Sequence, residues 1–186
     1  MSRLVIALSL LSCVAVAAAG KSHGYARNLE ADLQNTIPRK EKLTHIHFFF
    51  HDILTGPNPS AITIVPPRSN LSTLFGQVCV IDDPLTMGPD LNSGIIGRAQ
   101  GLYSSASQEE AALLLAMNLV FTEGEHKGST LTVLGRNSIF MKVREMPVIG
   151  GTGVFRFARG YVNARTYQFD MKTGLTIVEY DVYVWH

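Results

Sequence analysis

The feature that most constrains the fold is a series of short segments in which hydrophobic and polar residues alternate. The clearest segment is 176–185, where one face carries Val178, Tyr180, Val182 and Val184. Similar strand signals occur at 44–52, 61–65, 75–82, 95–103, 130–134, 143–149 and 155–166. Strands at regular spacing with turn residues between them predict a closed or nearly closed antiparallel β structure.

One segment gives conflicting signals. Ser107-Gln108-Glu109-Glu110 fits a helix capping box, and 111–117 has strong helix propensity, so local rules predict a helix from about Glu109. The residues 118–122, however, have the β-branched and aromatic character of a strand.

The N-terminus has the pattern of a secretory signal. Arg3 precedes an apolar run at 4–19 that ends in small residues, which predicts a signal peptide over 1–19. Residues 20–42 are polar and without a period, so we expect a flexible leader, followed by a single domain over 43–186. No later apolar run is long enough to span a membrane.

Charge and cysteine content narrow the classes of function. The net charge of +1 gives no electrostatic basis for nucleic-acid binding. Cys13 lies in the predicted signal peptide, so Cys79 is alone in the mature chain and is expected to be a buried, inert thiol. Asn70-Leu71-Ser72 is a glycosylation sequon in a predicted loop.

A glycine-rich segment occupies 150–160, with the sequence GGTGVFRFARG. It lacks the Gly-Lys-Ser/Thr ending and following helix of a phosphate-binding loop, so we expect a turn or bulge, followed by a strand from Val154. Glu145 and Arg159 could form a pair across this turn, either in the interior or in solvent. We predict that Arg159 points inward and Arg156 outward.

Three histidines, His45, His47 and His51, share one face of the first predicted strand. A His-x-His pair suggests a cupin-type metal site, but the acidic ligand expected at a fixed offset is missing. We therefore expect a surface or interface face here, with no metal and no cofactor.

The opposite face of that strand carries Ile46, Phe48 and Phe50 and ends at Asp52. If this face lines a barrel, Asp52 lies at the rim of an aromatic cavity, where desolvation makes it a candidate general acid. The alternative is a strand-end aspartate that begins a turn. In Asp82-Asp83-Pro84, which we expect to end a strand, adjacent residues face opposite sides, so at most one aspartate reaches the interior.

Several segments, in the same order along the chain, together resemble the plant dirigent proteins. They are 47–53 (HFFFHDI), 81–86 (IDDPLT), 97–103 (GRAQGLY), 121–124 (FTEG), 128–131 (GSTL), 144–147 (REMP) and 150–161 (GGTGVFRFARGY). The resemblance covers about residue 43 to the C-terminus. It implies an all-β fold, an eight-stranded antiparallel barrel of the calycin or allene-oxide-cyclase type with a central apolar cavity. It also implies that 104–123 is largely strand.

The resemblance also implies a function. Family members hold phenoxy radicals of monolignols, supplied by a separate laccase or peroxidase, so that they couple with one stereochemistry. Other members resemble true lyases that dehydrate an isoflavanol to a quinone methide and close the pterocarpan ring. Secretion to the plant cell wall and assembly as a trimer or dimer are further expectations. A barrel that only binds a phenolic ligand, as lipocalins bind theirs, is the alternative from another class.

The site residues follow from the matching motifs. Asp52, Glu145 and Arg159 are expected to be catalytic, and substrate-binding roles are expected for Asp83, Tyr103, Phe50 and Phe48. The acids would hydrogen-bond or protonate phenolic oxygens, while Tyr103 and Arg159 would orient the ring or stabilise a developing phenolate. Glu145 stands where pinoresinol-forming members have Asp, and the lone cysteine cannot form their disulfide. The chain is thus similar to the subfamily of the pterocarpan-forming members.

Overall fold

The computed structural model describes residues 41–68, 70–170 and 172–186. The predicted signal peptide and nearly all of the predicted leader lie outside these ranges. Within them, no helix is long and apolar enough to cross a membrane.

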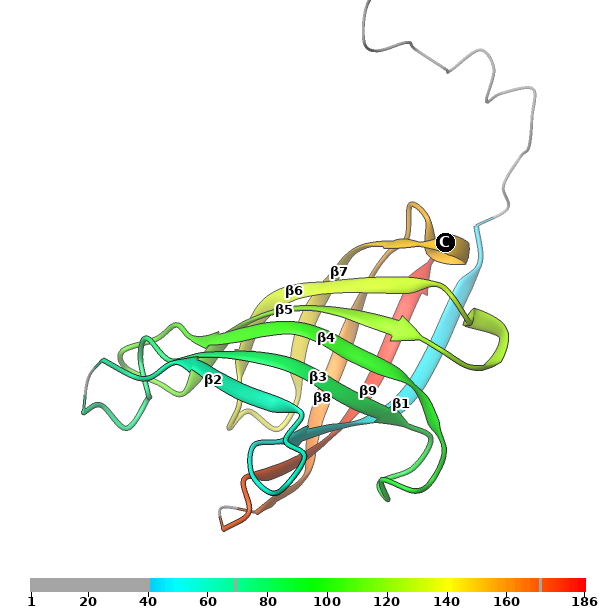
Figure 1. Ribbon diagram of the computed structural model, residues 1–186. Coiled ribbons are helices and arrows are strands. Elements are labelled where there is room, and N and C mark those ends of the chain that lie inside the picture. Colours follow the sequence, from blue (N-terminus) through cyan, green and yellow to red (C-terminus); the bar gives the residue numbers. More distant parts are fainter. Residues whose placement is uncertain (1–40, 69, 171) are drawn as a thin grey trace, which may run out of the picture. The chain divides into compact units, whose positions relative to one another are not determined.

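The regular secondary structure of the described chain is almost entirely β strand (Figure 1). Its strands are β1 (Leu43–Ile53), β2 (Ala61–Val65), β3 (Val78–Thr86), β4 (Ile95–Ser105), β5 (Ala112–Phe121), β6 (Thr130–Ser138), β7 (Arg144–Thr152), β8 (Arg159–Asp170) and β9 (Leu175–Trp185). Two short 3-10 turns, η1 (Gly124–His126) and η2 (Gly153–Phe155), lie in the β5–β6 and β7–β8 connections.

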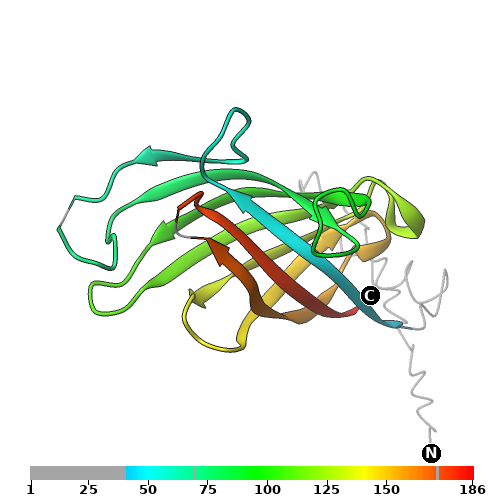
Figure 2. The ribbon, with the colours of Figure 1, turned by 90° about the horizontal axis from the view of Figure 1, so that it is seen from below.

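The sheet closes on itself. Antiparallel pairing runs in the order β1-β9-β8-β7-β6-β5-β4-β3, and β1 then pairs with β3 through Phe49 opposite Thr86 and Phe50 opposite Leu85. These eight strands form the predicted antiparallel barrel, whose curvature is visible in Figures 1 and 2. β2 extends the sheet by pairing with the first half of β3.

The barrel interior is the hydrophobic core. Phe48, Leu85, Leu131 and Val182 are fully buried on the inward faces of four different strands. The alternation predicted for 176–185 is confirmed, because Val178, Tyr180, Val182 and Val184 are all buried. Burial of such side chains, at about 25 cal/mol per Å² of apolar surface, drives the closure of the sheet.

The local prediction of a helix from about Glu109 is wrong. Residues 112–121 form β5, which pairs along its length with β4 on one side and β6 on the other. The predicted capping contacts do form, but in the β4–β5 loop. There Ser107 Oγ accepts hydrogen bonds from the backbone N–H groups of Glu109 and Glu110, at 3.3 Å each. Pairing on both edges outweighs a propensity worth only a few tenths of a kcal/mol per residue.

The glycine-rich segment combines a bulge and a turn. A register shift between Thr132 and Val133, opposite Gly150, is the predicted bulge in β7. A Cβ on Gly151 would lie 2.5 Å from the carbonyl oxygen of Thr130, and Gly153 has φ +64°, so both positions require glycine. The strand predicted from Val154 is wrong, because the chain forms η2 and re-enters the sheet only at β8.

The predicted end of a strand at Asp83-Pro84 is also wrong. β3 continues through Pro84 to Thr86. Leu85 and Thr86 pair with β1 and so close the barrel. The strand is extended because the closed barrel needs this pairing, which the local sequence does not reveal.

Candidate functional site

Asp52 continues the inward face of β1 that carries Ile46, Phe48 and Phe50. Its Oδ2 accepts a hydrogen bond from the Tyr103 hydroxyl of β4 at 3.3 Å, whereas its Oδ1 is buried without a hydrogen-bond partner among the described residues. Burial raises the pKa of Asp52 to about 6, and the Tyr103 hydrogen bond acts in the opposite direction. Asp52 therefore faces the barrel interior and is not a strand-end aspartate that begins a turn.

Asp83 is the second interior carboxyl group and is completely buried in β3. The Ser60 hydroxyl donates to its Oδ1, while Oδ2 has no partner within the described chain. Burial, followed by the nearby charge of Asp52, raises the pKa of Asp83 to about 8. Asp82 points outward and pairs with Arg98 at 2.6 Å, which confirms that only one of the two aspartates reaches the interior.

Aromatic rings share the barrel interior with these carboxyl groups. Phe48 stacks on Tyr180 of β9 with centroids 5.4 Å apart, and Phe50 lies 5.7 Å from the same ring. Burial raises the pKa of Tyr180, and charges on Arg144, Asp83 and Asp52 act on it. Tyr180 is therefore close enough to Arg144, Asp83 and Asp52 for their charges to act on it.

Arg144 is a buried cation that sequence reasoning missed. The residue is only 5% exposed and lies on the inward face of β7 with Met146 and Val148. Its Nη1 donates to the carbonyl oxygen of Ile139 at 3.1 Å and to Thr166 Oγ1 at 2.7 Å, and its Nε is buried without a partner among the described residues. No carboxylate pairs with it in the described ranges, and burial lowers its pKa. The alternation of Arg144 with Met146 and Val148 was the signal that could have identified it.

Asn137 is a second interior polar residue that the sequence did not single out. It follows Leu131, Val133 and Gly135 on the inward face of β6, and its Oδ1 is buried without a partner in the described chain. Four buried atoms on inward faces thus lack partners: Asp52 Oδ1, Asp83 Oδ2, Asn137 Oδ1 and Arg144 Nε. Because each such atom costs about 1–3 kcal/mol, a ligand with matching hydroxyl and oxygen groups would explain them together.

The predicted interior position of Arg159 is wrong. Arg159 is exposed, and its guanidinium makes two hydrogen bonds to the Glu41 carboxylate, at 2.6 and 2.8 Å. Glu145 is also exposed, on the outer face of β7 opposite Asn163. The two residues do not pair across the glycine turn, because Glu145 lies opposite Asn163, four residues further along β8 than Arg159. Arg156 is exposed, as predicted.

Two of the three histidines of β1, His45 and His47, are exposed and share one carboxylate, whereas the third is buried, against the expectation of a surface face. Asp181 Oδ1 lies 2.8 Å from His45 Nε2 and 3.1 Å from His47 Nδ1, while the buried His51 bonds Thr86 Oγ1 at 2.7 Å. In the described residues, no group of three or more His, Cys, Asp or Glu side chains is arranged to hold a metal ion. Cys79 is fully buried, as expected, and Asn70 is exposed.

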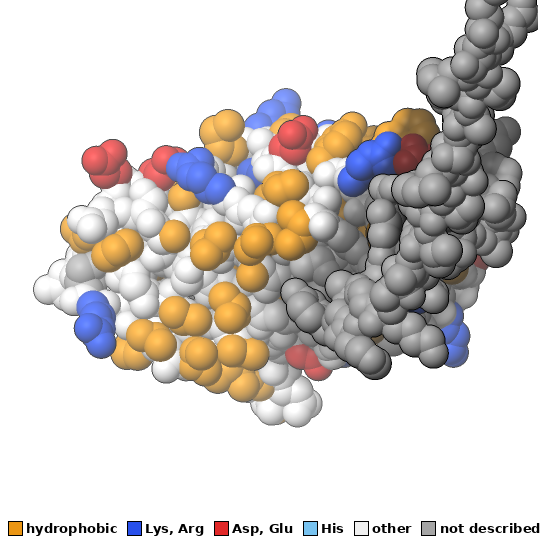
Figure 3. Space-filling view, turned by 90° about the horizontal axis from the view of Figure 1, so that it is seen from above, with side chains coloured by type: hydrophobic (Ala, Val, Ile, Leu, Met, Phe, Trp, Pro, Cys, Tyr) orange, Lys and Arg blue, Asp and Glu red, His pale blue; other side chains and the backbone are white. Residues whose placement is uncertain are grey.

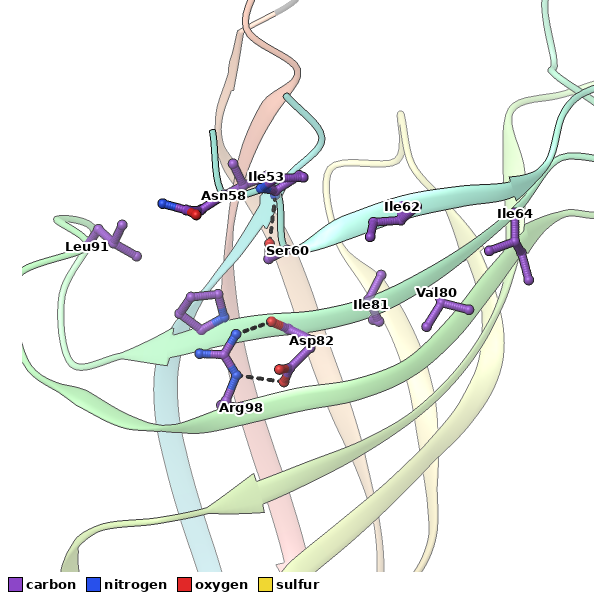
Figure 4. Close-up of a pocket in the computed structure, with 12 residues that line it drawn as sticks. Ile53, Asn58, Ser60, Ile62, Ile64, Val80, Ile81, Asp82, Leu91 and Arg98 are labelled. Atoms are coloured by element: carbon purple, nitrogen blue, oxygen red, sulfur yellow. Dashed lines mark hydrogen bonds and ion pairs between the residues drawn. The ribbon is translucent and has the colours of Figure 1, made fainter. Parts of the chain in front are cut away.

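A pocket of about 620 Å³ is lined mainly by residues of β2, β3, β4 and the adjoining loops (Figure 4). Its wall includes the outward-facing Val80 and Asp82 of β3, Arg98 of β4, and Ile62 of β2. Ser60 also lines this pocket, so one residue contacts both the outer pocket and the interior carboxyl group of Asp83.

The interior site has the composition of an acid–base centre. Two neighbouring carboxyl groups have pKa values pushed apart, with Asp83 higher than Asp52. At neutral pH such a pair holds one proton that can be donated and one carboxylate that can accept a proton. Arg144 adds a buried positive charge that can stabilise an oxyanion, and the aromatic rings form an apolar wall for a planar substrate.

Comparisons with known proteins agree with this fold. The family model for dirigent-like proteins matches residues 43–185. Pterocarpan synthase 1 of Glycine max is 53% identical over 151 residues, 80% of this chain and 81% of that protein. Dirigent protein 7 of Arabidopsis thaliana is 49% identical over 183 residues, 98% of this chain and 97% of that protein. The solved structure of the pterocarpan synthase dirigent protein GePTS1 superposes with a TM-score of 0.75 at 50% identity, covering 78% of this chain and 86% of that one. The chain therefore belongs to the dirigent family.

Proposed function

We propose that this protein is a carbon–oxygen lyase that removes water from an isoflavanol-type phenol and closes a new ring stereoselectively. The observation that carries the proposal is the buried Asp52–Asp83 pair, in which each carboxyl group has one oxygen without a partner among the described residues. Orientation of two radicals requires no acid, whereas loss of a hydroxyl group as water requires a proton donor. The 53% identity to a pterocarpan synthase supports the same assignment.

The proposed reaction has two steps. In the first, the Asp83 carboxyl donates its proton to the leaving hydroxyl group, the C–O bond breaks, and water leaves. The substrate phenol loses its proton to Asp52, which gives a neutral quinone methide. In the second step, another phenolic oxygen of the substrate attacks the methide carbon and forms the new C–O bond. Its proton returns to the Asp83 carboxylate, and the ring carbonyl regains a proton from Asp52, so both acids are restored.

The remaining interior residues would position the substrate. Arg144 Nε would donate to the carbonyl oxygen of the quinone methide, where negative charge increases in the first transition state. The stacked Phe48 and Tyr180 rings would hold the planar rings of the substrate in one orientation, which sets the product's handedness.

The proposal also includes the setting in which the protein works. Secretion to the plant cell wall rests on the N-terminal signal pattern, and a glycan at Asn70 rests on its exposed sequon. A homo-oligomer is supported by apolar side chains on an outer face, where Val80 lies opposite Leu102, and Leu134 lies two strands further along. Figure 3 shows hydrophobic side chains gathered on one outer face of the molecule.

The test is turnover of racemic 2′-hydroxyisoflavanol in the absence of any oxidase, followed by chiral chromatography. We expect one enantiomer to be consumed, and Asp83→Asn to reduce the rate at least about a hundredfold, since general acid catalysis contributes roughly 10²–10⁴. Glu145→Gln is the matched control, because it neutralises a carboxylate that belongs to another family motif and is exposed on the outer face of β7. No turnover by the wild-type protein, or full activity of Asp83→Asn, would contradict the proposal.

Stereocontrol of radical coupling is the second candidate, favoured by the apolar aromatic wall of Phe48, Phe50 and Tyr180. It predicts an enantiomeric excess when a laccase and coniferyl alcohol are supplied. A racemic product in that assay, together with isoflavanol turnover, selects the lyase.

A further inference from the structure

Ser60 occupies a fixed position in the barrel wall, at the end of the β1–β2 loop. Its backbone N–H donates to the carbonyl oxygen of Ile53 at 2.9 Å, and its own carbonyl oxygen accepts the N–H of Asp82 at 2.8 Å. Its Oγ accepts the N–H of Ile53 at 3.1 Å, the contact drawn in Figure 4. The residue is thus held between β1 and β3, and its hydroxyl group has little freedom to move.

The hydroxyl group of Ser60 has one proton and two acceptors within reach. One acceptor is Oδ1 of Asp83, and the other is the carbonyl oxygen of His51, 3.3 Å away. The carboxyl oxygen is the nearer of the two. We therefore assign the hydroxyl proton to the bond with Asp83.

This bond decides which oxygen of Asp83 carries the acidic proton. A neutral carboxyl group has one protonated oxygen and one that only accepts, and Oδ1 is occupied as an acceptor. The unprotonated oxygen is the stronger acceptor, so the Ser60 contact at Oδ1 favours the proton on Oδ2, the buried oxygen that has no partner among the described residues. We propose that Ser60 is a positioning residue, which fixes the Asp83 carboxyl group so that its transferable proton lies on Oδ2, away from the Ser60 contact.

The other charged groups around Asp83 do not perform this role. Asp52 and Asp82 act on Asp83 through charge and favour its neutral form, whereas Arg98 favours the ionised form. Such charges change how strongly the proton is held, but they do not distinguish between the two oxygens of one carboxyl group as a directed hydrogen bond does. Ser60 is the residue whose removal would free the carboxyl group to rotate or to protonate on either oxygen.

The first measurement is a pH titration of Asp83, monitored by the ¹³C NMR signal of its carboxyl carbon. It is carried out on the wild type, Ser60→Ala and Ser60→Thr. The Asp83 signal is assigned by its absence in Asp83→Asn. Because Ser60 stabilises the ionised form, Ser60→Ala should raise the midpoint by roughly one pH unit, and Ser60→Thr should restore it. This titration needs no activity, so it tests the contact even if the proposed function is wrong.

The second measurement is turnover of the isoflavanol, and this part rests on the proposed function. Ser60→Ala should lower kcat about tenfold with KM little changed, since the residue contacts the acid rather than the substrate. The alkaline limb of the pH profile should move upward by the same amount as the NMR midpoint. Ser60→Thr should recover most of the rate. Ser93→Ala is the matched control, because this half-buried loop serine bonds only backbone groups and should change neither readout.

Two results would overturn the inference. An unchanged Asp83 midpoint in Ser60→Ala would show that the hydroxyl group does not act on this carboxyl group. A shifted midpoint with an unchanged kcat would show that the placement of the proton has no role in the reaction. If the wild type turns over no isoflavanol, the proposed function fails, and the NMR titration alone decides the contact between Ser60 and Asp83.

Discussion

Replacement of Asp83 by Asn should change how the stability of the barrel depends on pH. In the native state the pKa of Asp83 is raised from 3.8 to about 8, mainly by burial. The native protein therefore keeps a proton that the unfolded chain releases, and the free energy of unfolding falls as pH rises from about 4 to about 8. Below this window both states are protonated, and the contribution is constant.

The magnitude follows from the same values. A difference of about four pH units corresponds to roughly 5–6 kcal/mol, which is an upper limit because part of the shift is repulsion from Asp52. Asp83→Asn removes this dependence and leaves the smaller one of Asp52, roughly 3 kcal/mol for a pKa raised from 3.8 to about 6. Near pH 4 the variant should thus be no more stable than the wild type. Near pH 8 it should be more stable than the wild type.

Chemical unfolding in urea, followed by circular dichroism at steps from about pH 4 to about pH 9, measures both curves. Asp82→Asn is the matched control. That carboxyl group is exposed, and its hydrogen bond to Arg98 lowers its pKa. Its contribution to the free energy of unfolding is therefore lost as the pH falls, which is the opposite direction to Asp83. Parallel curves for wild type and Asp83→Asn between about pH 4 and about pH 8 would refute the assignment of Asp83 as a buried, protonated acid.

Four further predictions concern other parts of the molecule. Arg144→Met should lower kcat at least about tenfold, because the buried cation is lost, and should preserve the β-sheet circular dichroism spectrum, because an apolar side chain takes its place. Arg144→Lys should recover only part of the rate. Full activity of Arg144→Met would exclude a role of Arg144 in stabilising an oxyanion. Tyr103→Phe should shift the acidic limb of the pH profile upward, because the hydrogen bond that favours ionised Asp52 is lost; an unmoved limb would contradict that contact. Arg159→Ala should leave turnover and product handedness unchanged, since its guanidinium contacts Glu41 at the surface, and a loss of stereoselectivity would place it in the site after all. Gly153→Ala should destabilise the barrel by about 1–3 kcal/mol in urea unfolding, because φ +64° is unfavourable for alanine; an unchanged midpoint would show that the turn relaxes.

The strands were predictable where alternation was regular, because one buried face leaves a period of two in the sequence. The segments at 95–103 and 176–185 are therefore strands in nearly the predicted places. Residues 112–121 were misassigned by local rules, since the partners that hold β5 on both edges lie elsewhere in the chain. The strand predicted from Val154 failed for a similar reason, because a left-handed glycine at 153 starts a turn.

The placement of the candidate residues was predicted in part. Asp52, Asp83, Tyr103, Phe48 and Phe50 face the interior, as the motifs implied. The choice of the cation was wrong: Arg159 was expected inside from the family motif, yet it is exposed and bonds Glu41. Arg144 alternates with apolar residues on a regular strand, and it is this arginine that is buried.

The sequence by itself determined the antiparallel β class and the inward or outward face of each regular strand, because these depend only on the period of the side chains. Tertiary structure alone decided which strand closes the ring, where β3 ends, and which arginine lies inside. It also decided the ionisation of the acids. The pKa of Asp83 is raised because closure of the barrel removes its carboxyl group from water and places it near Asp52, a residue far away in the chain.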